Sequence, residues 1–244
     1  MPRERLDVLL VARGLFPSRE RAQRAIMAGL VRVGDHCMDK PGARVDLEAA
    51  VQVESGERYV GRGGLKLEAA LAGFALNPAD EVCLDIGAST GGFTDCLLQH
   101  GARKVYAVDV GHSQLDWKIR SDGRVVVLEK VNARYLTEAE VPEEVGGCVL
   151  DVSFISLTLV LGPTVARVRN GGWVVALVKP QFELSREEVG RGGVVRDAGL
   201  HERAVEKIRR FVSGFSDWHW EGCMESPILG GHGNREFLAC LRKG

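Results

Sequence analysis

The stretch VCLDIGASTGGFTDCLL, which runs from Val82 to Leu98, decides the fold of this 244-residue chain. It opens with an apolar run that is typical of a buried parallel strand, and we expect Asp85 to end that strand. A glycine-rich turn follows, and a helical pattern begins at Phe93. A strand, a glycine turn and a helix in this order bring backbone N–H groups close to a ligand at the helix N-terminus.

Two phosphate-binding motifs share part of this spacing, and neither fits well. The P-loop matches the interval from Gly87 to Gly92, but Phe93 stands where that motif needs a lysine. An apolar residue cannot neutralise a triphosphate, so we reject this motif. The dinucleotide fingerprint is weak because it needs a glycine where Ser89 stands. An ordinary tight turn of an α/β protein remains the structural alternative.

Two carboxylates flank the turn. Asp85 precedes it, and Asp109 closes the next apolar run. Their separation is near the ~20-residue spacing at which a carboxylate can bond ribose hydroxyls. A turn with two carboxylates and no basic residue suits a nucleoside without phosphates, including a cationic one. We therefore predict S-adenosylmethionine as the ligand.

Composition limits the class of protein. The chain is 45% hydrophobic and 27% charged with a net charge of −1, so any nucleic-acid surface must be local. Its six cysteines include no C-x-x-C pair, which favours buried free thiols in a reducing compartment over zinc binding. The sequence lacks a signal-peptide pattern and any run near the ~20 apolar residues of a membrane span. We therefore expect a cytoplasmic protein.

The first 55 residues form a separate module. We expect a helix from Leu6 that ends at Gly14, a second helix capped by Ser18 that ends at Gly29, a short strand to Val33, and a returning segment over residues 44–53. Arginines on one helical face indicate contact with a phosphate backbone, and a solvated face is the alternative. The candidate RNA-binding residues are Arg3, Arg5, Arg19, Arg21, Arg24, Arg58 and Arg62.

This module resembles the RNA-binding domain first named from ribosomal protein S-four. The matching pattern is Arg5-Leu6-Asp7, Ser18-Arg19, the run from Ala22 to Gly29, and the run from Val31 to Gly34. The resemblance implies a small α+β RNA-binding domain over residues 1–55. A polar, glycine-rich linker over residues 56–64 then leads to the main domain, residues 65–244.

Strand and helix patterns alternate along the main domain, which predicts a doubly wound parallel sheet. We expect strands at 82–84, 105–110, 125–128, 148–154 and 173–179, with a closing pair at 217–225 and 236–242. Helices are expected at 65–74, 114–119, 158–169 and 201–211. The polar segment over residues 181–199 is long for a connection, so we interpret it as a mobile lid or substrate loop.

Four charged residues are expected at or near the ligand-binding edge of this sheet: Lys66, Asp151, Lys179 and Glu236. A structural ion pair between Asp151 and Lys179 is one interpretation, because an acid and a lysine inside apolar strands need partners. Activation of a hydroxyl group is the other. Lysine is a poor base at its usual pKa of ~10.4, but burial and a second cation, Lys66, would favour its neutral form. Lys179 would then accept a proton from an alcohol.

The main domain resembles the FtsJ/RrmJ-type ribose 2′-O-methyltransferases, and the whole chain resembles the TlyA (haemolysin A-like) family. The matching segments are GRGGLKLEAAL, LDIGASTGGFTD, VYAVDVG, LDVSFISL, LVKPQFE and GNREFL. The resemblance implies a Rossmann-like methyltransferase with a mostly parallel seven-stranded sheet. It also implies a Lys-Asp-Lys-Glu catalytic tetrad on Lys66, Asp151, Lys179 and Glu236.

The same resemblance implies a binding site for S-adenosylmethionine and a substrate in ribosomal RNA, at cytidine 2′-hydroxyls in 16S or 23S rRNA, with no metal and no membrane. The implied cofactor residues are Asp85, Gly87, Ser89, Gly91, Gly92, Phe93, Thr94, Asp109 and Asn132. After Asp151 the sequence Val152-Ser153-Phe154 lacks the prolines of amino-methylating enzymes, which favours a ribose oxygen over a base amine.

Two other functions compete with a methyltransferase. A non-catalytic RNA-binding or ribosome-assembly factor would need only the arginine-bearing module, although a complete tetrad argues against it. A membrane-active haemolysin, which the family's other name suggests, lacks an amphipathic or apolar membrane segment. These patterns predict neither the target nucleotide nor the oligomeric state.

Overall fold

The computed structural model describes residues 3–27, 29–53, 58–190 and 192–244. Two compact units make up the chain, Met1–Arg58 and Tyr59–Gly244, and each is considered by itself. Residues 56 and 57 of the expected linker and Arg191 of the expected lid lie outside the described residues. The rest of that linker belongs mainly to the second unit, whose first helix begins at Gly63.

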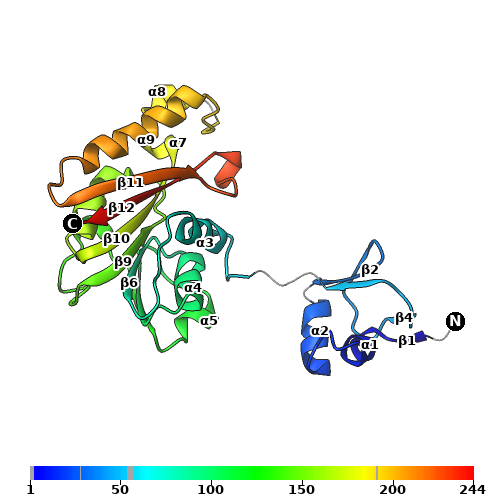
Figure 1. The fold of residues 1–244 in the computed structure, drawn as a ribbon. Coiled ribbons are helices and arrows are strands. Elements are labelled where there is room, and N and C mark those ends of the chain that lie inside the picture. Colours follow the sequence, from blue (N-terminus) through cyan, green and yellow to red (C-terminus); the bar gives the residue numbers. More distant parts are fainter. Residues whose placement is uncertain (1–2, 28, 54–57, 191) are drawn as a thin grey trace. The chain divides into compact units, whose positions relative to one another are not determined.

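The first unit packs two helices against short strands (Figure 1). Helices α1 (Leu6–Ala12) and α2 (Arg19–Met27) agree with the predicted ones, and so does β2 (Val31–Val33). The expected return over residues 44–53 is two strands, β4 (Arg44–Asp46) and β5 (Val51–Val53). Strands β1 (Arg3–Arg5) and β3 (His36–Met38) were not predicted, because three-residue strands show no period. Strand β1 pairs with β4, and β2 pairs with both β3 and β5.

The second unit is built on a seven-stranded sheet in the order β11-β12-β10-β9-β6-β7-β8. Figure 1 labels β11, β12, β10, β9 and β6 in this sheet. Five strands are parallel, and β12 runs antiparallel to both of its neighbours. This arrangement confirms the predicted methyltransferase-like sheet. The strands are β6 (Val82–Ile86), β7 (Lys104–Asp109), β8 (Val125–Glu129), β9 (Val145–Leu150), β10 (Val168–Val178), β11 (Trp218–Glu225) and β12 (Phe237–Lys243).

Helices cover both faces of this sheet. Alternate residues of β6 point to opposite cores, with Leu84 on one face and Cys83 on the other. The Leu84 face packs against α6 (Leu161–Val165) and α9 (Ala198–Val212), and the Cys83 face packs against α3 (Gly63–Gly73), α4 (Gly92–Gln99) and α5 (Trp117–Arg120). Because both faces are buried, the strands are apolar throughout, and this is why the sequence shows continuous runs.

Three expectations for this unit were wrong in detail. Asp85 lies inside β6 and does not end it. Strand β9 ends at Leu150, so Asp151 and Val152 to Phe154 belong to the loop after it. The expected helix over residues 158–169 is a short 3₁₀ turn, Leu157–Leu159, followed by α6, because β10 already begins at Val168.

The expected lid over residues 181–199 is also shorter than predicted. It contains α7 (Pro180–Glu183) and α8 (Arg186–Val189), and only residues 190–197 connect α8 to α9. Local signals for both helices are present in the sequence. Pro180 occupies the first turn of α7, and Ser185 with Glu188 forms a capping box at the start of α8. Among the described residues, no helix is long and apolar enough to cross a membrane.

Candidate active site

The turn after β6 is bonded to the end of β7. The backbone N–H of Ser89 donates to Asp109 Oδ2 at 2.8 Å, and the N–H of Gly111 donates to Asp109 Oδ1 at 2.7 Å. Asp109 therefore orients two loops at the carboxyl edge of the sheet. Such an edge is where open α/β sheets bind ligands.

Gly87 allows this turn to approach the loop after β9. Its φ of +84° is in the left-handed region, and a Cβ placed on it would lie 2.4 Å from the backbone oxygen of Asp151. Any side chain here would force the two loops apart, so glycine is required for contact as well as for conformation. Gly92 has a similar role, because a Cβ there would lie 3.0 Å from the backbone oxygen of Gly61.

Three adjoining hollows open around the loop after β9. The first, of about 430 Å³, is lined by Gly87, Ser89, Asp109, Asn132 and Asp151 among others. The second, of about 240 Å³, shares Gly87, Ser89 and Asp151 with it and adds Lys66, Gly92 and Phe93. The third, of about 390 Å³, contains Lys179 and Glu236 and shares Ser153 and Phe154 with the first.

The four charged candidates form two ion pairs. Lys66 Nζ lies 2.6 Å from Glu236 Oε2, and Lys179 Nζ lies 2.6 Å from Asp151 Oδ1. Lys66, Lys179 and Glu236 are buried, whereas the Asp151 side chain is 22% exposed. All four line the three hollows, so residues 170 positions apart are brought to one place.

Three of the nine cofactor candidates lie beneath the hollows and do not line them. Asp85 and Thr94 are fully buried, and Thr94 Oγ1 donates to Asp85 Oδ2 at 2.6 Å. Gly91, with a φ of +96°, faces Leu115 and Ile119. Strand β6 continues past Asp85, which turns this carboxyl toward α4 and away from the opening.

Asp85 is an unusual buried acid. Its Oδ1 has no hydrogen-bond partner among the described residues. Burial raises the pKa of Asp85 to about 7, the hydrogen bond from Thr94 opposes that rise, and the charges of Asp151 and Asp109 add to it. The glycine turn therefore covers a buried carboxyl whose ionisation is disfavoured.

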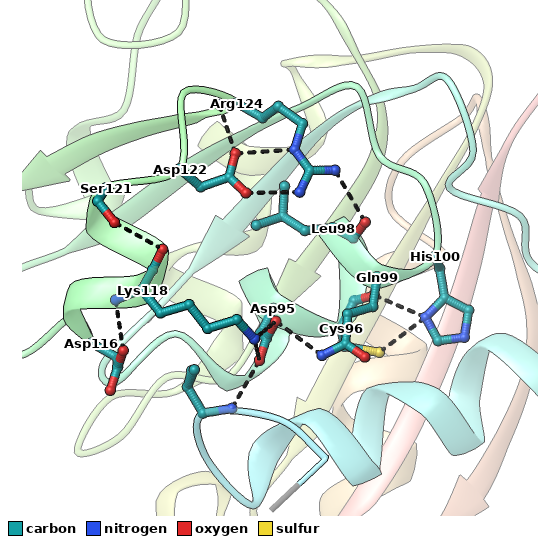
Figure 2. Close-up of polar contacts among 11 residues, drawn as sticks. Asp95, Cys96, Leu98, Gln99, His100, Asp116, Lys118, Ser121, Asp122 and Arg124 are labelled. Atoms are coloured by element: carbon teal, nitrogen blue, oxygen red, sulfur yellow. Dashed lines mark hydrogen bonds and ion pairs between the residues drawn. The ribbon is translucent and has the colours of Figure 1, made fainter. Parts of the chain in front are cut away.

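A second buried acid, Asp95, holds the chain before α3 against α4. Its Oδ2 accepts from the backbone N–H of Val60 at 2.9 Å. Figure 2 shows that the same carboxylate accepts hydrogen bonds from the Lys118 ammonium and the Gln99 amide. The segment from Tyr59 to Gly64 is thereby kept beside the glycine turn. Sequence analysis missed Asp95, although an acid among the apolar residues of α4 was a usable signal.

The predicted RNA-binding arginines divide into two groups. Arg5 and Arg19 are bonded to the fully buried Asp7, with Nε to carboxylate distances of 3.0 and 2.9 Å. These bonds, together with one from Gln23, hold the pKa of Asp7 well below its ordinary value. Part of their role is therefore structural. The remaining candidates are exposed: Arg3, Arg21, Arg24, Arg58 and Arg62.

The first hollow fits the cofactor that the sequence predicted. Gly87 brings the turn against the loop that carries Asp151. The lining of the hollow offers two carboxylates and the Asn132 side chain. Carboxylates suit ribose hydroxyls and a cationic ligand, and an amide suits the edge of a base. The residues of this lining that could hold S-adenosylmethionine are Gly87, Ser89, Asp109 and Asn132.

Comparisons with known proteins identify the family. The family model for FtsJ-like methyltransferases matches residues 59–243, and the S4 domain model matches residues 4–51. The 16S/23S rRNA (cytidine-2′-O)-methyltransferase TlyA of Mycobacterium tuberculosis is 46% identical over 246 residues, which cover 98% of this chain and 90% of that protein. The chain belongs to the TlyA (haemolysin A-like) family.

Two further relatives extend this TlyA-family assignment. YqxC of Bacillus subtilis is 50% identical over 244 residues, which cover 98% of this chain and 85% of that protein. A solved structure from Streptococcus thermophilus is 49% identical with a TM-score of 0.74, and the match covers 100% of this chain and 89% of that chain. The expected two-part TlyA organisation, an S4 domain and an FtsJ-like domain, is therefore confirmed.

Proposed function

We infer that this chain is an S-adenosylmethionine-dependent methyltransferase that modifies cytidine 2′-hydroxyls of ribosomal RNA. Family membership over almost the full length carries this function. One structural observation supports the same reaction: Lys179, which lines the hollow that contains Glu236, is paired with Asp151, which lines the adjoining hollow that contains Asp109. A buried amine beside an open cavity suits removal of a proton from an alcohol.

The mechanism assigns a task to each side chain. S-adenosylmethionine, when bound, supplies an electrophilic methyl carbon that bonds to ribose O2′ as its bond to sulfur breaks. Lys179, as a neutral amine, accepts the proton of the 2′-hydroxyl at Nζ. Asp151 Oδ1 then stabilises the resulting ammonium, because charge-assisted hydrogen bonds are stronger than neutral ones. No His or Cys is needed for the transfer.

The second ion pair has a different task. The ammonium of Lys66 lines the hollow beside the glycine turn, and Glu236 holds it through a 2.6 Å bond. A fixed cation here would stabilise the developing negative charge on the substrate oxygen while the proton leaves it. Gly230 allows this placement, since a Cβ there would lie 1.9 Å from Glu236 Oε1.

Recognition of the RNA falls to the S4 domain and to the exposed arginines of the first unit. Their guanidinium groups match phosphate geometry, so they supply affinity without a code for sequence. We propose that the substrate is presented within a ribosomal subunit, where folded RNA would define the target, and that the enzyme works in the cytoplasm.

The test is to incubate purified protein and S-adenosylmethionine with unmodified 16S and 23S rRNA, free and within subunits. Mass spectrometry of nuclease fragments should find 2′-O-methylcytidine at a single position in at least one RNA. A Gly87→Ala variant is the negative control, because its Cβ would lie 2.4 Å from the backbone oxygen of Asp151. That clash would force the two loops apart and should abolish transfer. RNA binding without methylation by the wild-type protein would instead identify a binding or assembly factor.

A further inference from the structure

Two side chains of the described residues lie at hydrogen-bonding distance from the Lys179 amine. Asp151 Oδ1 lies 2.6 Å from Nζ, and Ser153 Oγ lies 2.9 Å from it. The Phe182 ring lies beside the same nitrogen, with its centroid 5.9 Å away. Ser153 is exposed and lines both the first and the third hollow, so it borders the space where the methyl donor and the ribose would meet.

The bonding geometry of nitrogen limits the direction in which the lone pair of this amine can point. A neutral primary amine has two N–H bonds and one lone pair in tetrahedral directions. When one N–H donates to Asp151 and the other to Ser153, only the third direction remains for the lone pair. With the carboxylate alone, the amine could rotate about its Cε–Nζ bond and point the lone pair elsewhere.

We propose that Ser153 is a positioning residue for Lys179, whose hydroxyl directs the amine lone pair toward the 2′-hydroxyl of the substrate. The inference rests on the proposed function and adds a fifth side chain to the four charged ones. The proton still passes from ribose oxygen to Lys179 Nζ, and Ser153 neither gains nor loses a proton.

The loop that carries Ser153 is anchored to the segment that carries Lys179. Glu183 of α7, four residues after Lys179, is buried and accepts from the backbone N–H of Leu157 at 2.8 Å and from Ser156 Oγ at 2.6 Å. Lys207 of α9 holds the same carboxylate. The loop is therefore attached at two points to the chain after β10, which fixes the distance between the hydroxyl and the amine.

The test compares Ser153→Ala with Ser153→Thr, which keeps the hydroxyl. Ser213→Ala, an exposed serine on the C-terminal cap of α9, is the matched control. In single-site methylation assays, Ser153→Ala should lower kcat about tenfold, which is the scale of the loss of one hydrogen bond. KM for RNA and the calorimetric affinity for S-adenosylmethionine should not change. Ser153→Thr should recover most of the rate.

The pH profile separates positioning from a merely structural role. The hydroxyl stabilises the ammonium more than the amine, so Ser153→Ala should move the midpoint of kcat to lower pH by about one unit while the plateau falls. Among the described residues, the other titratable groups beside the amine or in its hollow are Asp151, Glu236 and His232, and all of them stay in both variants.

The proposal would be overturned if wild type and Ser153→Ala had the same kcat and the same midpoint in the pH profile of kcat. A variant that lost only affinity for S-adenosylmethionine would overturn it as well. Neither result would affect the proposed function, because the wild-type enzyme would still methylate RNA. Absence of methylation by the wild type is the separate outcome that removes the proposed function itself.

Discussion

Asp7 in the first unit and Asp85 in the second are both fully buried, yet their surroundings are opposite. Arg5, Arg19 and Gln23 all donate to Asp7, and its pKa lies well below the ordinary value. Asp85 accepts one hydrogen bond, from a hydroxyl group, and its other oxygen has no partner among the described residues. Its pKa is raised to about 7.

The difference separates an acid whose ionised form is stabilised by its neighbours from one whose ionised form is not. A buried carboxylate with several donors stabilises its fold, and its cost of burial is offset locally. A buried carboxylate with one donor destabilises its fold when ionised, so its presence needs another explanation. The glycine turn that it supports, and the cationic ligand proposed above that turn, provide one.

The largest expected effect is a pH-dependent difference in stability. Asp85 is protonated in the folded unit up to about pH 7, whereas the unfolded chain ionises near 3.8. Its stabilising contribution is therefore full below 3.8 and is lost as pH rises through 7. Relative to Asp85→Asn, which stays neutral, the wild type should lose up to about 4 kcal/mol of unfolding free energy between pH 4 and pH 8.

Hydrogen exchange of β6 amides at several pH values measures this difference for the second unit alone. Asp122→Asn is the matched control, because Arg124 lowers the pKa of Asp122 and the pH dependence should have the opposite sign. A difference between wild type and Asp85→Asn that stays constant with pH would mean that the carboxyl is ionised throughout the range.

Removal of Asp7 should destabilise the first unit by about 3 kcal/mol. Asp7→Ala leaves two arginines and Gln23 without their shared acceptor, and the value is at the low end for a broken buried pair because the arginines are partly exposed. Hydrogen exchange of α1 and α2 in the full chain reports the loss. Asp35→Ala, an exposed acid of the same unit, should leave exchange unchanged; similar exchange in both variants would refute the structural role.

The smallest effect concerns cofactor affinity. Above pH 8 the ionised Asp85 should attract a cationic ligand, and Asp85→Asn should weaken binding of S-adenosylmethionine about fivefold, the scale of a screened charge interaction. Below pH 6 both proteins carry a neutral group and should bind equally. Calorimetric titration at both pH values measures this, and equal affinities at pH 8 would assign Asp85 a purely structural part.

Sequence patterns predicted much of the candidate site because its parts are local in the sequence. Each part lies within a short segment whose residue types indicate its chemistry. These parts are the glycine turn, Asp109 at the end of its strand, and the arginine-bearing helices. The alternation of apolar runs with helical patterns predicted the layers of the sheet, since strands buried on both faces have no polar alternation to obscure them.

Other features depend on contacts between distant residues. Lys66 was expected as a second cation near Lys179, but its bonded partner is Glu236. That pairing requires β12 to insert antiparallel beside β10, which no local period encodes. The burial of Asp85 beneath the turn and the anchoring of the Ser153 loop by Glu183 follow from packing in the same way.

Single-turnover methylation by Lys179→Ala tests the central claim most directly. At saturating S-adenosylmethionine and RNA, loss of the proton acceptor should slow transfer at least about a thousandfold, within the range of general base catalysis. Cofactor affinity should match the wild type, because Lys179 lies in the third hollow and not in the first. Transfer at the wild-type rate would contradict the account, since the 2′-hydroxyl would then lose its proton without this amine.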